Sequence, residues 1–325
     1  MARVVITRRI PGDAVQTIES AGHDVVTWEG ELPPSPAELR TLLEGASAVM
    51  TMVTDRIDAA VLTELPGLRI AANMAVGYDN LDCPAGEAAG VWITNTPGIL
   101  HQTTAEFAVA LLLSAARNVT ASDRDTREGG WKTWSPTAFL GIDLHTATVG
   151  IIGLGEIGAS VAKVIRGFGS RVLYTGRNRK SELEASLGVE YRSLDDLLRE
   201  SDIVSLHVPR TAETTKMLGA REFGLMKPTA LLVNTARGSI IDQDALVVAL
   251  QSAEIGGAAL DVTDPEPLPL DHPLYSFSNV IITPHIASAS VGTRSRMAEC
   301  AAQNIIAVLN GEAPLNPVNR PPSPR

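Results

Sequence analysis

Residues 147–179 read ATVGIIGLGEIGASVAKVIRGFGSRVLYTGRNR, and this stretch decides the fold. An apolar run to Ile152 predicts a β-strand, which a glycine-rich turn, a helix to about Phe168 and a second strand over 171–175 follow. The turn is Gly153-Leu154-Gly155-Glu156-Ile157-Gly158. Its first glycine permits a tight turn, its second lets the backbone approach a pyrophosphate, and its third lets the helix pack on the strand. The stretch therefore predicts a dinucleotide-binding turn whose phosphates face the positive end of the helix; an incidental glycine-rich turn is the alternative.

The residues after the second strand bear on which dinucleotide binds. A site for NAD has a carboxylate near this point to accept the ribose hydroxyls, whereas this chain has Gly176-Arg177-Asn178-Arg179-Lys180. Guanidinium groups attract the 2′-phosphate that a carboxylate repels. We therefore expect NADP(H) to be the preferred cofactor, with NAD(H) also able to bind. A solvated basic loop is the alternative interpretation.

The composition sets the outer limits. A length of 325 residues predicts two domains, and 45% hydrophobic with only 4% aromatic residues predicts cores of Ala, Val, Leu and Ile. The net charge of −10 argues against a nucleic-acid surface or a polybasic membrane contact. Cys83 and Cys300 have neither disulfide-framework nor metal-ligand spacing, so no metal site is expected. Since no signal-peptide pattern and no apolar run of bilayer length occur, we expect a cytoplasmic location.

The first hundred residues alternate short apolar strands with helical segments, which predicts a small α/β domain with a parallel sheet. In the loop Asn73–Asn80, a glycine at a strand end can expose backbone N–H groups to an anion; a plain turn is the alternative. Asn95-Thr96-Pro97-Gly98 has the composition of a hinge, and Thr103-Thr104-Ala105-Glu106 has the capping-box pattern that begins a helix. The proline-rich tail 321–325 is expected to be disordered.

Polar residues follow four later strands at the point where each strand is expected to end. Because the carboxyl ends of parallel strands share one edge of a sheet, these residues are expected to lie on the same edge as the glycine turn. They are His207-Val208-Pro209, Thr235-Ala236-Arg237, Asp261, and His285 after Thr283-Pro284.

Three of the candidate side chains together suit the reduction of a 2-oxo acid. Arg237 can bind a carboxylate with two parallel hydrogen bonds, and His285 can donate or accept a proton near neutral pH. Glu266, between two prolines, can pair with the imidazole. Taken singly, each has a bland alternative: a structural histidine, a solvated arginine and a glutamate in a surface turn.

These motifs together resemble the D-isomer-specific 2-hydroxyacid dehydrogenases. The matching segments are Val76–Asn80, Asn95–Gly98, Thr104–Glu106, Gly153–Gly158, Asn234–Gly238, Ala259–Val262 with Glu266, and Thr283–His285. Within the family the chain is most similar to glyoxylate/hydroxypyruvate reductases, through Gly129–Trp134 and Tyr174–Arg177. The resemblance implies an α/β protein with two doubly wound parallel-sheet domains. A Rossmann-type cofactor domain, 99–287, would be inserted into a flavodoxin-like substrate domain, 1–98 plus 288–325.

The resemblance also implies roles for individual residues. His285 is expected to be the acid/base, Glu266 its partner and Arg237 the substrate anchor, with backbone N–H groups of Val76 and Gly77 as a carboxylate cradle. Asp261 is expected near the nicotinamide carboxamide, and Val53, Leu100 and Trp134 near the substrate. The remaining residues expected to bind the cofactor are Thr104, Leu154, Glu156, Ile157, Arg177, Asn178, Arg179, His207, Val208, Pro209, Thr235 and Ala236.

The resemblance finally implies an NAD(P)-dependent enzyme that reduces small 2-oxo acids, such as glyoxylate or hydroxypyruvate, by hydride transfer. It further implies a homodimer joined through the cofactor domains, with Trp134 reaching the partner's pocket. One departure is Ala287 where the family usually has glycine after the catalytic histidine. Alternatives are another D-2-hydroxyacid dehydrogenase, a phosphite dehydrogenase-like enzyme and, outside the enzymes, a dinucleotide-sensing corepressor.

Overall fold

The computed structural model describes residues 1–325, which divide into two compact units. The first unit comprises Met1–Leu100 and Ser288–Arg325, and the second comprises His101–Ala287. The sequence placed the first domain boundary between residues 98 and 99, and the units divide between residues 100 and 101. It placed the second between residues 287 and 288, where the units also divide. No helix is long and apolar enough to span a membrane.

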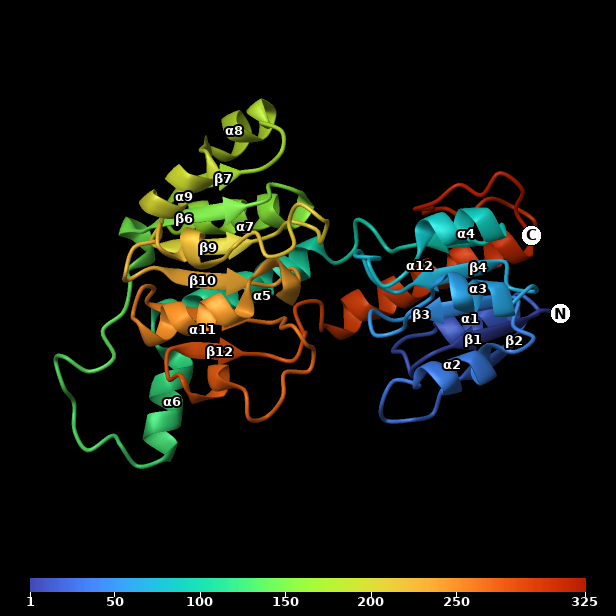
Figure 1. The fold of residues 1–325 in the computed structure, drawn as a ribbon, viewed down its shortest axis with the longest axis horizontal. Helices are drawn as coiled ribbons and strands as arrows, with labels where there is room; N and C mark the ends of the chain where they lie inside the picture. Colours follow the sequence, from blue (N-terminus) through green and yellow to red (C-terminus); the bar gives the residue numbers. More distant parts are fainter. The chain divides into compact units, whose positions relative to one another are not determined.

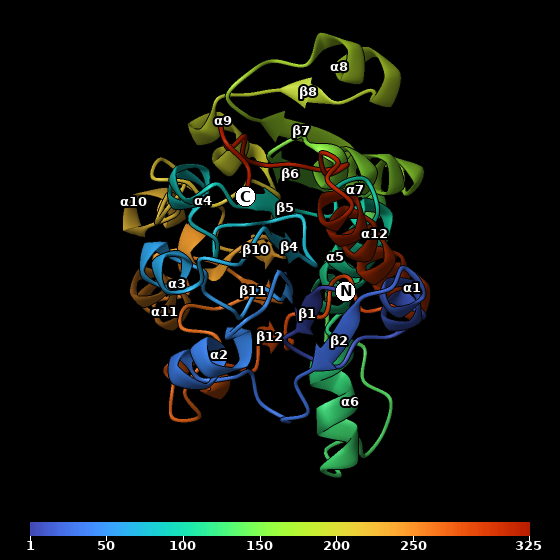
Figure 2. The ribbon, with the colours of Figure 1, turned by 90° about the vertical axis from the view of Figure 1, so that its right-hand side faces the viewer.

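The first unit is a five-stranded, all-parallel sheet with helices on both faces. Its strands lie in the order β2-β1-β3-β4-β5, which is the flavodoxin-like doubly wound order. In Figure 2, α2, α3 and α4 lie on one side of this sheet and α1 and α12 lie together on the other. The elements are β1 (Arg3–Ile6), α1 (Ala14–Ser20), β2 (Asp24–Thr27), α2 (Pro36–Leu43), β3 (Ala48–Thr51), α3 (Ala59–Glu64), β4 (Ile70–Asn73), α4 (Cys83–Ala89), β5 (Trp92–Thr94) and α12 (Val291–Leu309).

The second unit is a seven-stranded parallel sheet in the order β12-β11-β10-β9-β6-β7-β8, visible as the stacked arrows of Figure 1. Helices α5 and α7 pack on one face, and α9, α10 and α11 on the other. The strands are β6 (Thr148–Ile152), β7 (Arg171–Thr175), β8 (Glu190–Tyr191), β9 (Ile203–Leu206), β10 (Leu231–Asn234), β11 (Gly257–Leu260) and β12 (Val280–Ile282). The helices are α5 (His101–Ala116), α6 (Val119–Arg127), α7 (Glu156–Gly167), α8 (Ser181–Leu187), α9 (Leu194–Glu200), α10 (Ala220–Phe223) and α11 (Gln243–Gln251), with 3₁₀ turns η1 (Leu144–Thr146), η2 (Gly238–Ile240) and η3 (Pro273–Ser276).

These two sheets confirm the expected fold class, an α/β protein of two doubly wound parallel sheets. The strands form because apolar runs of four or five residues are buried on both faces by helices, as parallel sheets require. In the second unit the chain leaves β6 first toward β7 and later, from β9, in the opposite direction. The carboxyl end of β6 is therefore the switch point at which such sheets bind ligands.

The strands of the second unit end in register. Ile152 pairs with Leu206, Leu206 with Asn234, Asn234 with Leu260, and Leu260 with Ile282. The next residue on each strand therefore falls in one row, with adjacent strands about 4.8 Å apart. The row is Gly153, His207, Thr235, Asp261 and Thr283.

Two local expectations were wrong. Helix α5 begins at His101, so Thr103 lies inside its first turn rather than before it. Thr and Glu are also tolerated in a first turn, so the capping-box pattern does not by itself fix the start. The tail is not disordered: Pro321 is buried, and the backbone N–H of Arg325 donates to Gly90 O at 2.9 Å.

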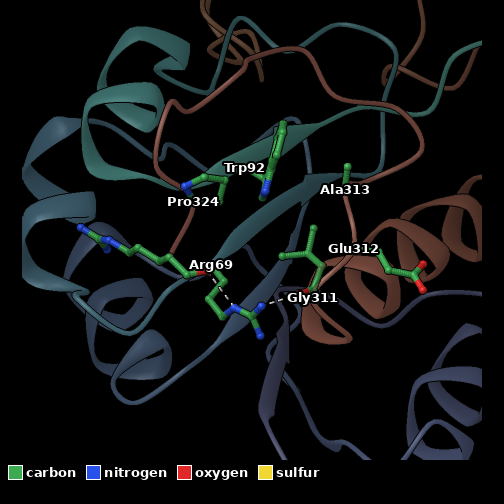
Figure 3. A pocket seen from close by; sticks show the side chains of 8 residues that line it. Arg69, Trp92, Gly311, Glu312, Ala313 and Pro324 are labelled. Carbon is green, nitrogen blue, oxygen red and sulfur yellow. Dashed lines mark hydrogen bonds between the residues drawn. The ribbon is translucent and has the colours of Figure 1, made fainter.

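A cavity of about 370 Å³ in the first unit shows what holds the tail (Figure 3). The guanidinium of Arg69 lies on one side and donates to the carbonyl oxygens of Val308, Leu309 and Arg325, at 2.6, 3.2 and 3.1 Å. Arg69 therefore joins the end of α12 to the tail. Since its donors already bind the main chain, the cavity is explained as part of the packing of this segment.

Ion pairs hold the edge strands of the second unit. Arg171 on β7 donates to both carboxylate oxygens of Glu190 on β8, each at 2.9 Å, and to Glu200 at 2.6 Å. Arg192 binds the same two carboxylates. Hydrogen bonds from Arg171, with its charge and that of Arg192, lower the pKa of Glu190 to about 2.

This shift predicts how stability depends on pH. Because the pKa of Glu190 falls from 4.5 to about 2 on folding, the stabilisation is complete above pH 4.5 and is lost as pH falls toward 2. Arg171→Met is expected to lower the free energy of unfolding by about 1 kcal/mol or less, since both side chains are partly exposed. It should also make the decline of stability below pH 4.5 shallower.

Urea unfolding at a series of pH values measures this effect. Arg40→Met, which removes one exposed ion pair with Glu64 in the first unit, is the matched control and should leave the acid decline unchanged. An acid decline in Arg171→Met as steep as that of the wild type would contradict the assignment.

Candidate active site

The glycine-rich turn has the conformation that its sequence predicts. Gly153 has φ +98°, and a Cβ there would lie 2.7 Å from the carbonyl oxygen of His207. A Cβ at Gly158 would lie 2.0 Å from Gly153 O, so the third glycine is required where α7 packs against β6. A Cβ at Gly155 would meet nothing within 4 Å. The space above the second glycine is therefore open, as the approach of a pyrophosphate requires.

Two further observations show that these residues fit a dinucleotide. Helix α7 begins at Glu156 with no side-chain cap, so the first N–H groups of the helix are left to bind an anion. The hydroxyl of Thr235, in the row of strand ends, is buried without a hydrogen-bond partner. Buried polar atoms normally have partners, so an orphaned hydroxyl at this edge is consistent with a ligand. Of the other expected cofactor residues, Thr104 is buried within α5, and Leu154 and Ile157 pack into the core beside α7.

The basic loop after β7 contains two exposed arginines, one bound by a carboxylate and one without a hydrogen bond. The guanidinium of Arg179 donates to Glu184 on α8 at 2.7–3.1 Å and lies 5.9 Å from the ring centroid of Tyr191. The hydroxyl of Tyr174 donates to the same carboxylate at 2.6 Å and accepts the backbone N–H of Lys180 at 2.8 Å. Arg177 makes no hydrogen bond and is exposed, as is Asn178. The loop is thus fixed at both ends, with Arg177 exposed between them.

His207 follows β9 and lies beside the glycine turn. Its Nε2 is 2.8 Å from the hydroxyl of Ser205, and burial lowers its pKa to about 4. The ring is therefore neutral at physiological pH. Val208 is half-buried and Pro209 exposed. A neutral, fixed imidazole beside the turn suits a polar contact and not proton transfer near pH 7.

Glu266 and His285 meet, as the sequence predicted for this pair. His285 Nδ1 lies 2.6 Å from Glu266 Oε1, and the two side chains are 28% and 40% exposed. Since the carboxylate accepts the Nδ1–H, Nε2 is the nitrogen left to act on a substrate. His285 has φ +53°, in the left-handed region that non-glycine residues rarely adopt. Such strain is characteristic of functional sites.

Asp261 fixes the loop that carries His285. One carboxylate oxygen accepts the hydroxyl of Thr283 at 2.7 Å and the N–H of Ile286 at 2.9 Å, and the other accepts the N–H of Ala287 at 2.8 Å. The backbone N–H of His285 donates to the carbonyl of the same aspartate at 2.9 Å. Asp261 is 1% exposed. The close backbone approach is therefore made with alanine at 287, where the family usually has glycine.

Arg237 follows β10, two strands from β12 in the sheet. It is half-buried, and its Nη1 donates to Ala236 O at 2.9 Å. The side chain of Asn234 accepts the N–H of Ala236 and donates to Arg237 O, at 2.9 and 2.8 Å, so it shapes the turn that carries the arginine. Arg237, Asp261 and His285 thus come from three successive strand ends on one edge of the second unit.

The expected substrate residues lie partly in the first unit. Val53 is exposed after β3, Val76 and Gly77 are half-buried after β4, and Leu100 is buried at the end of the segment after β5. Trp134 lies on an exposed loop of the second unit and is itself 79% exposed.

The family model described as "D-isomer specific 2-hydroxyacid dehydrogenase, NAD binding domain" matches residues 109–287, the stretch that contains the glycine turn, Arg237, Glu266 and His285. The chain belongs to this family. A glyoxylate reductase of Korarchaeum cryptofilum (strain OPF8) is 49% identical over 319 residues, with 98% of this chain and 96% of the relative covered.

Solved structures extend the comparison within the family. A protein of Thermus thermophilus is 46% identical with a TM-score of 0.92, over 97% of this chain and 99% of that one. An NADPH-dependent glyoxylate/hydroxypyruvate reductase of Sinorhizobium meliloti, in complex with NADP and malonate, is 31% identical with a TM-score of 0.87. The alignment covers 100% of this chain and 98% of that one. The resemblance read from the motifs is confirmed.

The hydrogen bonds of Asp261 predict a local effect of its substitution. In Asp261→Asn an amide group replaces one acceptor oxygen and faces N–H or O–H donors, so at least one of the three bonds is lost. We expect the free energy of unfolding to fall by about 1–3 kcal/mol. Amide hydrogen exchange at Ile286 or Ala287 should accelerate because the loop opens locally.

Chemical denaturation and hydrogen exchange measure the two effects. The control is Asp264→Asn, at an exposed aspartate three residues further along the chain. Unchanged protection of both Ile286 and Ala287 would show that Asp261 does not hold the loop.

Proposed function

We propose that this protein catalyses the NADPH-dependent reduction of small 2-oxo acids, glyoxylate and hydroxypyruvate among them, to 2-hydroxy acids. The observation that carries the proposal is the Glu266–His285 pair, 2.6 Å apart, on the sheet edge that also carries the glycine turn and Arg237. The glyoxylate reductase relative supports the substrate class, since it is 49% identical over nearly the whole chain.

The proton chemistry follows from the hydrogen bond of the imidazole. In the reducing direction His285 acts as the protonated imidazolium. Glu266 accepts the Nδ1–H and fixes the ring, and Nε2 carries the second proton, which the substrate oxygen receives. A bound nicotinamide would supply the hydride to the keto carbon. As the hydride arrives, the carbonyl oxygen would take the proton of His285 in the same step, so no free alkoxide is formed.

The substrate would be oriented by the positive charge of Arg237 and by backbone N–H groups. Arg237 would bind the carboxylate of the 2-oxo acid and polarise the adjacent carbonyl through its planar guanidinium. The N–H groups of Val76 and Gly77 would bind the same carboxylate, with Val53, Leu100 and the partner's Trp134 near the rest of the substrate. Fixing both reactants in this way removes orientational entropy from the barrier.

The preference for NADPH rests on the loop after β7. Arg177 is exposed and makes no hydrogen bond. Two carboxylates lie near these arginines. Glu184 is bound by Arg179 and Tyr174, which lowers its pKa, and Glu213 interacts electrostatically with Arg177 without a hydrogen bond between them. Arg177 and Asn178 therefore present a positive charge and an amide at the strand end, next to Arg179, whose charge is paired with that of Glu184; this arrangement favours a 2′-phosphate. The Sinorhizobium meliloti relative, solved with NADP, supports this assignment.

The protein is also proposed to be a homodimer joined through the cofactor domain. A loop of the second unit carries four large apolar side chains that are between 46% and 79% exposed. They are Trp131, Trp134, Phe139 and Leu140. Exposed apolar side chains gathered on one loop are typical of a protein interface.

The acid/base assignment predicts a large loss in one variant. His285→Ala is expected to lower kcat for glyoxylate reduction by about a hundredfold or more, because it removes the proton donor. Glu266→Gln keeps an acceptor for Nδ1 without the charge, so a smaller loss is expected. Steady-state kinetics with NADPH measures both, and the dissociation constant for NADPH should change little. A His285→Ala enzyme within a few-fold of the wild type would refute the role.

The cofactor assignment predicts a change in the NADPH/NADH ratio. Arg177→Ala should raise KM for NADPH by about tenfold or more and leave KM for NADH nearly unchanged, since only NADPH carries the 2′-phosphate. Arg199→Ala, which removes an exposed arginine from α9, is the control for the loss of one charge. Equal catalytic efficiency of the wild type with both cofactors would contradict the proposed preference.

A further inference from the structure

In a run of three successive peptide groups that join Ala75 to Tyr78, after β4, the carbonyls accept hydrogen bonds within the protein and the N–H groups donate none. The carbonyl of Ala75 accepts the N–H of Thr96 at 2.9 Å, that of Val76 accepts Asn95 Nδ2 at 2.8 Å, and that of Gly77 accepts Asn73 Nδ2 at 2.8 Å. Each carbonyl in the run thus has a donor from its own unit. The run is therefore fixed in orientation as well as in position.

The other side of the same run carries free donors. The only cis peptide bonds are two that precede prolines elsewhere, so the N–H of each peptide group here points away from its carbonyl. The N–H groups of Val76, Gly77 and Tyr78 donate no hydrogen bond within the protein. Backbone N–H groups seldom remain unpaired unless they meet solvent or a ligand, and a succession of them forms a concavity that binds anions.

A buried network connects this run to the loop after β3. Asn80 Nδ2 donates to the carbonyls of Met52 and Asp55 at 3.0 and 2.8 Å, and Asn80 Oδ1 accepts from Asn73 Nδ2 at 3.2 Å. Asn73 Oδ1 in turn accepts the hydroxyl of Thr51 at 3.0 Å. Asn73 is fully buried, and Asn80 and Asn95 are half-buried.

The loop after β3 is itself closed by a buried carboxylate. Asp55 Oδ2 accepts the N–H of Met52 at 2.7 Å and the hydroxyl of Thr7 at 2.5 Å, and the residue is 2% exposed. Val53 lies within this closed turn. The loops after β3 and β4, at the switch point of the five-stranded sheet and next to it, are thus one hydrogen-bonded assembly.

We propose that Asn73, Asn80 and Asn95 are positioning residues that hold the loops after β3 and β4, so that the N–H groups of Val76, Gly77 and Tyr78 bind the substrate carboxylate. The inference rests on the proposed function for the identity of that substrate. The three asparagines touch no substrate themselves. Asn95 and Asn73 donate hydrogen bonds to the carbonyls of Val76 and Gly77 and so fix the orientation of these peptide groups. The N–H groups on the opposite side then remain available to the substrate.

The test compares variants in their affinity for carboxylates. Asn95→Ala frees the carbonyl of Val76, and Asn73→Ala frees that of Gly77. We expect each to raise KM for glyoxylate and the dissociation constant for oxalate by roughly tenfold, the value of one lost orienting hydrogen bond. KM for NADPH should not change, and kcat should change less than KM. Asn95 is only half-buried, so its variant tests the proposal even if Asn73→Ala fails to fold.

Ser170→Ala is the matched control. Ser170 is a fully buried residue of the second unit whose hydroxyl donates to Leu144 O at 2.6 Å, away from Asn95 and from the loops after β3 and β4. A general loss of stability would reduce the active fraction in this variant and leave KM and the oxalate affinity unchanged. Wild-type KM and oxalate affinity in Asn95→Ala, or an equal weakening in Ser170→Ala, would overturn the inference.

Oxalate binding, measured by calorimetry with saturating NADP⁺, separates the two proposals. If the wild type fails to reduce glyoxylate but binds oxalate more tightly than Asn95→Ala does, the proposed function is wrong and the positioning role stands. If glyoxylate is reduced and Asn95→Ala binds oxalate as the wild type does, only the positioning role is wrong.

Discussion

Parallel pairing in register is the constraint on which the second unit depends. Because the last residues of β6, β9, β10, β11 and β12 pair with one another, every residue that follows a strand is brought to the same edge. Residues as distant in sequence as Gly153 and Thr283 thereby fall in one row. Helices bury both faces of the sheet, so this edge is where main-chain and polar groups remain available. The backbone pairing therefore determines which positions lie at this edge, and the side chains at those positions determine the chemistry.

A second requirement is that the row be held rigidly where it carries a reactive group. His285 lies in a left-handed conformation, which costs free energy unless neighbouring bonds compensate for it. Asp261 provides those bonds, to Thr283 on one side of the histidine and to Ile286 and Ala287 on the other. A buried carboxylate with three donors is thus explained by the backbone it organises. The resemblance implies a place for the same residue near the nicotinamide carboxamide, and that role stays a prediction.

Much of this arrangement could be predicted from the sequence because its signals are local. Short apolar runs that end at His207, Asp261 or His285 mark strand ends, and glycines at fixed spacing mark the turn after β6. Partners set by tertiary structure were not visible. Asn73 and Asn95 are 22 residues apart and bind neighbouring carbonyls of the loop after β4. The sequence assigned Asn73 to a loop and Asn95 to a hinge, and it predicted neither of these hydrogen bonds. The tail was wrongly expected to be disordered because the donors that hold it belong to Arg69, far away in the chain.

The pairing of Arg179 with Glu184 could be predicted only in part from the sequence. The two residues are five apart and opposite in charge, a spacing that the sequence displays openly, yet the loop conformation that joins them depends on the hydroxyl of Tyr174. Local charge alone therefore overstates how many arginines are free to bind a ligand. Both arginines are exposed, so it is hydrogen bonding that separates Arg177 from Arg179.

The main-chain nature of the donors at Val76, Gly77 and Tyr78 has an evolutionary consequence. A grip made of peptide N–H groups does not depend on which side chains the three positions carry, provided that the backbone keeps its course. Side chains around it, such as that of Val53, are then free to diverge and alter which acid fits. A scaffold of this kind can acquire new substrates by substitutions around the donors. The backbone N–H groups that bind the carboxylate shared by these substrates are retained.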